Sequence, residues 1–88
     1  IRNGRIVTAT DDYTADIFCA DQTITRIERG IDPKSLPAAT EVIDATGKLV
    51  FPGFIDPHVH IHLPFMGTHA KDTWETASRA ALIGGTTT

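Results

Sequence analysis

Short apolar runs separated by turn-forming residues fill the first fifty positions of the chain. Five stretches have strand character: 5–8, 15–20, 23–28, 41–44 and 49–51. Asp21-Gln22 separates the second stretch from the third and predicts a hairpin, and Ile24 and Ile27 have opposite parity in its second arm. That arm therefore carries a bulge or is buried on both faces. The pattern is typical of a small antiparallel sheet or of half a β-sandwich.

The pattern changes after Pro52. Residues 53–62 are predicted to form one strand with one wholly apolar face, which carries most of the following apolar residues: Phe54, Ile55, Val59 and Ile61. Residues 63–71 contain Pro64 and Gly67 and are predicted to be a loop. Strand, loop, helix and a new strand make one βα unit and the beginning of the next.

The helix of this unit is marked at both ends. Asp72, with Glu75 three positions later, predicts an N-terminal capping box. Trp74, Ala77 and Ala81 then share one helical face, and Gly84-Gly85 ends the helix before Thr86-Thr87-Thr88 begins a strand.

Composition narrows the class of protein. The chain of 88 residues allows one domain at most. It begins at Ile1 rather than at a methionine, and its last predicted strand is left incomplete, so we expect it to be part of a longer protein. Its net charge of -3 comes with no basic run, so we expect no nucleic-acid partner. No apolar run is long enough to span a membrane. The single cysteine, Cys19, lies in an apolar run, and we expect it to be buried and reduced.

Residues 56–62 contain the side chains best suited to bind a metal: Asp56, His58, His60 and His62 occupy every second position. Alternate residues of a strand share one face, so these four side chains are predicted to lie on one edge. An acid and three imidazoles suit a divalent metal such as zinc. His58 and His60 are the candidate ligands, and Asp56 either binds the metal or orients a histidine. His62 lies at the strand end, where a substrate-facing role is equally open.

An isolated H-x-H pair is more often structural than metal-binding. The longer pattern P-G-x-x-D-x-H-x-H, which follows short strands and opens a βα unit, is far more specific for a metal-hydrolase strand. Catalytic zinc takes three protein ligands and a water, so further ligands must come from elsewhere. Two further residues are expected to have no functional role: His69 is predicted to be a solvated loop residue, and Trp74 a packing residue.

These residues carry a family resemblance. The stretch PGFIDPHVH at 52–60 resembles the first barrel strand of the amidohydrolase superfamily, and NGRIV at 3–7 and VIDATGK at 42–48 look like the sandwich strands that precede it. The stretches PFMGT at 64–68, DTWET at 72–76 and AALIGGTTT at 80–88 resemble the dihydropyrimidinase and hydantoinase branch.

The resemblance implies a fold in which residues 1–51 supply strands of an N-terminal β-sandwich. Residues 52–88 supply the first strand, loop and helix of a (β/α)8 TIM-like barrel, truncated at the second strand. It also implies a cytoplasmic homotetramer with two zinc ions per full-length chain, bridged by a carboxylated lysine beyond Thr88. His58 and His60 would be ligands of the more buried ion, with Leu63 and Phe65 near the ring substituent of the substrate.

The implied reaction is zinc-dependent hydrolysis of a cyclic amide, a dihydropyrimidine or a 5-substituted hydantoin, to an N-carbamoyl amino acid. The catalytic aspartate of the family falls beyond Thr88, so this chain supplies no catalytic base and is predicted to be inactive alone. His62 departs from the acidic or amide residue expected there. The absence of an arginine after H-x-H argues against dihydroorotase. An allantoinase and a non-catalytic scaffold like the collapsin response mediator proteins stay open, although the intact histidine pair argues against the scaffold.

Overall fold

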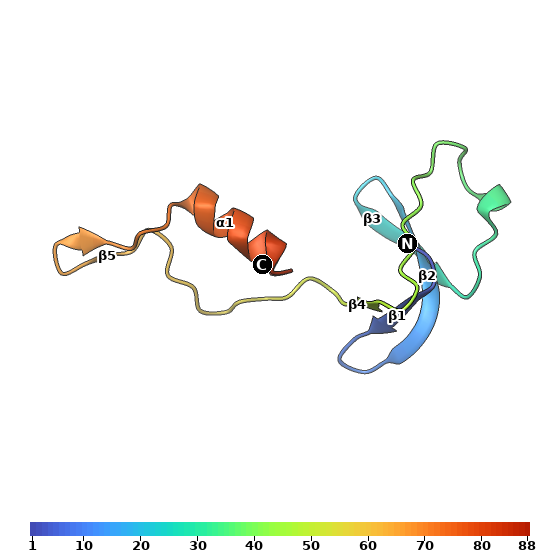
Figure 1. Ribbon diagram of the computed structural model, residues 1–88, viewed down its shortest axis with the longest axis horizontal. Coiled ribbons are helices and arrows are strands. Elements are labelled where there is room, and N and C mark those ends of the chain that lie inside the picture. Colours follow the sequence, from blue (N-terminus) through green and yellow to red (C-terminus); the bar gives the residue numbers. More distant parts are fainter. The chain divides into compact units, whose positions relative to one another are not determined.

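Residues 1–88 are described by a computed structural model, and they divide into two units, Ile1–Pro52 and Gly53–Thr88. The first unit is built on a four-stranded sheet in the order β3-β2-β1-β4 (Figure 1). Its strands are β1 (Gly4–Val7), β2 (Asp12–Ala20), β3 (Thr23–Glu28) and β4 (Leu49–Val50). No helix in either unit has both the length and the apolar character needed to cross a membrane.

The hairpin predicted around Asp21-Gln22 is confirmed. β2 pairs with β3 antiparallel, and the register shifts at Phe18/Cys19, where Phe18 faces Arg26 and Cys19 faces Ile24. Thr25 is therefore the extra residue, and the bulge predicted for the second arm lies there. Asp21 takes a φ of 54° at the turn, a left-handed conformation that aspartate tolerates better than most residues.

The sheet is mixed, which corrects the antiparallel expectation. β1 pairs with β2 antiparallel but with β4 parallel, through Arg5–Leu49 and Ile6–Val50. The strand predicted at 41–44 is also wrong, since it reduces to one parallel bridge between Arg2 and Asp44. A strand that pairs in parallel is joined to its partner by a long connection, so the local alternation of residues does not reveal the direction in which it pairs. A short 3-10 helix, Pro33–Ser35, lies within this connection.

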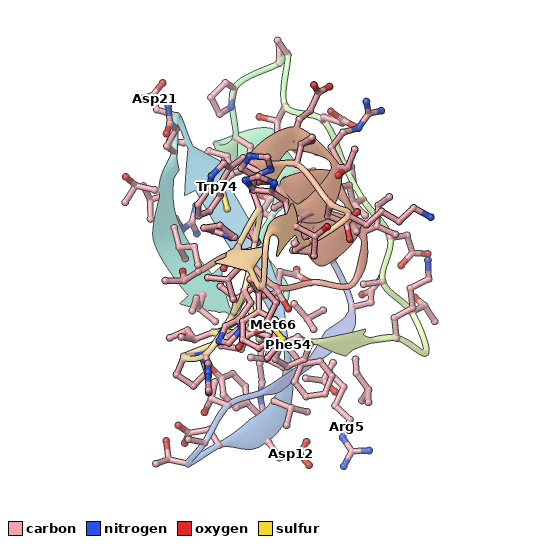
Figure 2. All side chains as sticks on the ribbon, turned by 90° about the vertical axis from the view of Figure 1, so that its left-hand side faces the viewer. Arg5, Asp12, Asp21, Phe54, Met66 and Trp74 are labelled. Atoms are coloured by element: carbon pink, nitrogen blue, oxygen red, sulfur yellow. The ribbon has the colours of Figure 1, made fainter.

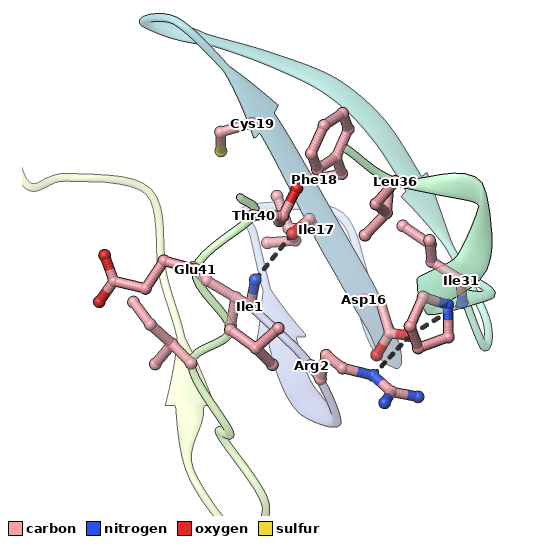
Figure 3. A pocket seen from close by; sticks show the side chains of 13 residues that line it. Ile1, Arg2, Asp16, Ile17, Phe18, Cys19, Ile31, Leu36, Thr40 and Glu41 are labelled. Atoms are coloured by element: carbon pink, nitrogen blue, oxygen red, sulfur yellow. Dashed lines mark hydrogen bonds and ion pairs between the residues drawn. The ribbon is translucent and has the colours of Figure 1, made fainter. Parts of the chain in front are cut away.

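The core of the first unit is small. Ile6, Ala15 and Ile17 are buried, with Ile1, Tyr13 and Val50 packed around them. Cys19 was predicted to be buried, and this is wrong: its side chain is exposed, and its thiol is free. Beside the core, Phe18 and Leu36 help to line an apolar hollow of about 290 Å³ (Figure 3). None of the candidate metal-binding histidines lines this hollow.

The second unit joins two extended segments through one helix. α1 (Trp74–Ile83) separates Phe54 from Thr86, and these two residues form a parallel bridge. The Phe54 amide donates to the Gly85 carbonyl at 2.9 Å, and the Asp56 amide donates to the Thr88 carbonyl at 2.8 Å. The connection is therefore strand-like segment, helix, parallel strand-like segment, as the βα pattern predicted.

The continuous strand predicted over residues 53–62 is wrong. Its backbone is bridged to the segment 85–88 at Phe54 and Asp56, and no strand is assigned over residues 57–62. A parallel strand depends on neighbours for its hydrogen bonds, and a single short neighbour supports only its first residues. The loop predicted at 63–71 instead contains a small hairpin, β5 (Pro64–Phe65) paired with β6 (Thr68–His69).

The helix begins one residue later than predicted. Thr73, not Asp72, is the N-cap, and its hydroxyl accepts from the Thr76 amide while the Thr76 hydroxyl accepts from the Thr73 amide. The capping box is therefore formed by two threonines rather than by Asp72 and Glu75. The helix ends at Gly84, as predicted. Trp74 is exposed, while Ala77 and Ala81 are half-buried, so only the alanines of the predicted face are covered.

Candidate metal centre

The two histidines of the H-x-H pair face each other. Nε2 of His58 and Nε2 of His60 lie 2.9 Å apart, and the ring centroids are 4.8 Å apart with the planes tilted by 51°. Alternation of the extended backbone puts both side chains on one side of the chain, as the spacing predicted. Two imidazole nitrogens that share one zinc ion at ~2.0–2.1 Å each stand about 3–3.5 Å apart, so the observed 2.9 Å is slightly shorter than the spacing of two ligands of one ion.

Asp56 supports this arrangement through the backbone. Its Oδ1 accepts a hydrogen bond from the His58 amide at 3.0 Å, and the structure gives it no bond to an imidazole nitrogen. An aspartate that accepts from the amide two residues on fixes the local turn. Asp56 therefore orients the segment that carries His58 rather than a histidine ring.

The pair is an incomplete ligand set. No group of three or more histidine, cysteine, aspartate or glutamate side chains in the structure is placed to hold a metal ion. Both histidines are exposed. Two donors alone bind a divalent ion weakly, so the site needs ligands in addition to His58 and His60.

His62 does not join them. It takes a φ of 50°, which breaks the two-residue alternation before it, and its ring stacks on His69 instead. The two ring centroids are 5.1 Å apart and the planes differ by 21°. His69, expected to be a solvated loop residue, is thus the neighbour that the sequence pattern missed. The sequence signal for this contact was the turn at Met66-Gly67, which folds the chain into a hairpin and so brings His69 back toward His62.

A hollow of about 510 Å³ lies next to the histidine pair. It is lined by His60, Leu63, Phe65, Thr68, His69 and Ala70. Leu63 and Phe65, the residues expected near a substrate substituent, therefore share a hollow with one of the candidate ligands. The walls are mostly apolar, and the imidazole of His60 brings a nitrogen donor to the edge of an apolar space.

Comparison with known proteins decides the family. A sequence model of the amidohydrolase family matches residues 41–86, which contain the histidine pair and the helix. The chain belongs to the amidohydrolase family. This match includes the hollow next to His60, so the candidate site lies within the part of the chain that defines the family.

Relatives narrow the branch of this amidohydrolase. It is 53% identical to the D-hydantoinase of Geobacillus stearothermophilus over the whole chain, which covers 18% of that protein. It is 45% identical to dihydropyrimidinase 2 of Caenorhabditis elegans, with 99% of this chain covering 16% of that protein. The chain thus spans less than a fifth of the length of these curated relatives, and it belongs with their hydantoinase and dihydropyrimidinase branch.

Solved structures give the same neighbours. The D-hydantoinase of a Thermus species matches with a TM-score of 0.88 and 64% identity, over 98% of this chain and 18% of that one. The dihydropyrimidinase of Brevibacillus agri matches with a TM-score of 0.88 and 43% identity over the same shares. The strand-rich first unit and the helical second unit therefore have the fold of a section of these enzymes.

Proposed function

We propose that this chain supplies two metal ligands and part of the substrate pocket of a cyclic amidohydrolase that opens dihydropyrimidines or 5-substituted hydantoins to N-carbamoyl amino acids. The observation that carries the proposal is the convergence of His58 and His60 at 2.9 Å beside the hollow lined by Leu63 and Phe65. The names of the relatives, D-hydantoinase and dihydropyrimidinase, support the same class of substrate.

Residues 1–51 would belong to a β-sandwich and residues 52–88 to the opening of a (β/α)8 barrel. The parallel bridge between Phe54 and Thr86, connected through α1, supports the second assignment. Neighbouring strands of such a barrel are parallel and joined by helices, and active sites lie at the carboxyl ends of the strands. His58 and His60 follow the paired residues 54–56 and would lie at that end.

His58 and His60 would hold zinc, with the carboxylated lysine and other ligands supplied from outside this chain. Bound zinc would polarise the ring carbonyl and lower the pKa of water. This chain's own part is to hold the ligands and to shape the pocket. Asp56 accepts the hydrogen bond of the His58 amide, and Leu63 and Phe65 line one side of the hollow with apolar side chains. A cytoplasmic homotetramer is proposed from the family resemblance alone.

Replacement of either ligand in the longest natural form of the polypeptide tests this proposal. We expect His58→Ala and His60→Ala each to lower kcat/KM for dihydrouracil and hydantoin at least about a hundredfold, with loss of bound metal, because each removes a protein ligand. Lys71→Ala, at an exposed position nearby, is the matched control and should keep both. Near-normal turnover and metal content in the histidine variants would overturn the site assignment.

A further inference from the structure

The hairpin β5–β6 has little to hold it in place. It pairs only Pro64 with His69 and Phe65 with Thr68, and its turn residues Met66 and Gly67 both have positive φ, 50° and 79°. Positive φ at both central residues is the signature of a type I′ turn. Isolated two-stranded hairpins are marginally stable in water, so a hairpin this short needs a tie at its base.

Two contacts form at that base. The Ala70 amide donates to the Leu63 carbonyl at 2.9 Å. Just outside it, the rings of His62 and His69 stack, with centroids 5.1 Å apart and planes 21° from parallel. Near-parallel aromatic rings at this distance attract each other beyond the area that they bury. The left-handed backbone of His62 turns its ring out of line with His58 and His60 and onto the hairpin.

The stack and the hollow share a residue. His69 touches His62 on one side and helps to line the hollow on the other, next to Leu63 and Phe65. Phe65 is 62% exposed and Leu63 is 39% exposed, so few packing contacts hold these two side chains in position. Their positions therefore depend on the hairpin backbone, and the hairpin depends on its base.

From this geometry we propose that the His62–His69 stack is a clasp that positions Leu63 and Phe65 and so sets which ring substituents the pocket accepts. The proposal rests on the proposed function and deepens it. His62 and His69 are positioning residues here: they act through the hairpin rather than on the reacting atoms. A clasp that works by stacking needs flat rings at both positions, not imidazole nitrogens.

The test uses the longest natural form of the polypeptide with its metal. The variants are His62→Ala, His69→Ala, the double alanine variant, and the double variant His62→Phe/His69→Phe, which restores two stackable rings. Lys71→Ala, just outside the hairpin, is the control. The first readout is the ratio of kcat/KM for a 5-phenylhydantoin to that for unsubstituted hydantoin. The second is hydrogen exchange at the Ala70 amide, which reports the base of the hairpin without any substrate.

Each alanine variant should change the substrate ratio about three- to tenfold, the range that an aromatic pair supplies. The double alanine variant should add little, since either single change already breaks the stack. Exchange at Ala70 should speed up in parallel, the phenylalanine pair should restore both readouts, and metal content should stay unchanged throughout.

Three results would overturn the clasp: an unchanged substrate ratio, additive effects of the two alanines, or no rescue by phenylalanine. Loss of metal in His62→Ala would also overturn it, because His62 would then be a ligand. If the wild type opens no cyclic amide, the proposed function fails, and the exchange measurement still decides whether the stack holds the hairpin.

Discussion

Asp16 has the most constrained side chain in the sheet unit. It is only 3% exposed, its Oδ1 accepts from the Asn3 amide at 2.8 Å, and its Oδ2 accepts from the Ile31 amide at 2.9 Å. Arg2 Nε lies 3.7 Å from Oδ2 (Figure 3). These contacts, the bond from Asn3 foremost, hold the pKa of Asp16 below its ordinary value of 3.8 despite burial. One carboxylate thus fastens three chain segments together.

We expect Asp16→Asn to lower the free energy of unfolding by about 1.5–3 kcal/mol at neutral pH, because an amide cannot accept from both backbone donors as a carboxylate does. Urea unfolding of the longest natural form measures this. Asp12→Asn is the control, since the Arg5–Asp12 pair is exposed and should matter less (Figure 2). Equal losses in both variants would contradict the role given to Asp16.

The lowered pKa also fixes the direction of the pH dependence. The contribution of Asp16 is fully present above its unfolded pKa of about 3.8 and is lost as pH falls through the lower folded value. The stability gap between wild type and Asp16→Asn should therefore close in acid, below about pH 4. A gap that stays constant as the pH is lowered well below that value would contradict the charged hydrogen bonds.

Sequence reasoning reached part of this residue-level picture. The two-residue spacing predicted that His58 and His60 face one another, because alternation is a local property of extended backbone. It placed His62 with them, and the left-handed backbone at that position, which spacing does not reveal, sends the ring elsewhere. Asp16 sits between apolar neighbours, and its partners at Asn3 and Ile31 are distant in sequence, so no local pattern marked it.

At the scale of elements, close approach of two backbones explains Gly53. A Cβ built there would overlap the side chain of Thr87 and lie 2.9 Å from its Cβ. Phe54 and Thr86 form the parallel bridge beside this contact, so the segment 85–88 packs directly on the chain at Gly53. Glycine is the residue that permits such an approach.

Gly53→Ala should therefore cost about 1–3 kcal/mol of stability, since the added methyl forces the two segments apart. Gly84→Ala is the matched control: φ is -78° there, and the nearest atom to an added Cβ lies at 3.4 Å, an ordinary contact. Thermal unfolding of the longest natural form compares the two. Similar melting temperatures for both variants would mean that the segments do not pack at Gly53.

Elements defined by neighbouring residues were predicted well, and those defined by distant partners were not. The hairpin, its bulge and the end of α1 follow from turn chemistry and parity. The strand over 53–62 and the antiparallel sheet failed because both depend on which distant segment pairs with which. The first turn of the helix was misplaced by one residue because Asp72 and Thr73 are both good caps.

At the scale of the whole chain, much apolar surface is left uncovered. Ile55 is 71% exposed, Val59 56% and Phe54 51%, and Leu82 and Ile83 of α1 are exposed as well. Apolar surface of this extent marks an interface or a site of association. The chain spans 18% of the length of the related D-hydantoinase.

We therefore expect the isolated 88-residue polypeptide to associate in solution and to open no cyclic amide. Association covers the apolar side chains, and two histidines alone do not complete a metal site. Sedimentation velocity and a dihydrouracil hydrolysis assay measure the two parts. A monodisperse monomer that hydrolyses dihydrouracil would refute both.

The most direct test of the metal assignment is zinc per chain, measured by elemental analysis on the longest natural form of the polypeptide. We predict about two zinc ions per chain, as in a two-metal hydrolase, and a loss of bound zinc in His58→Ala. A folded protein that contains no metal would contradict the hydrolase assignment and would favour a non-catalytic relative that binds protein partners.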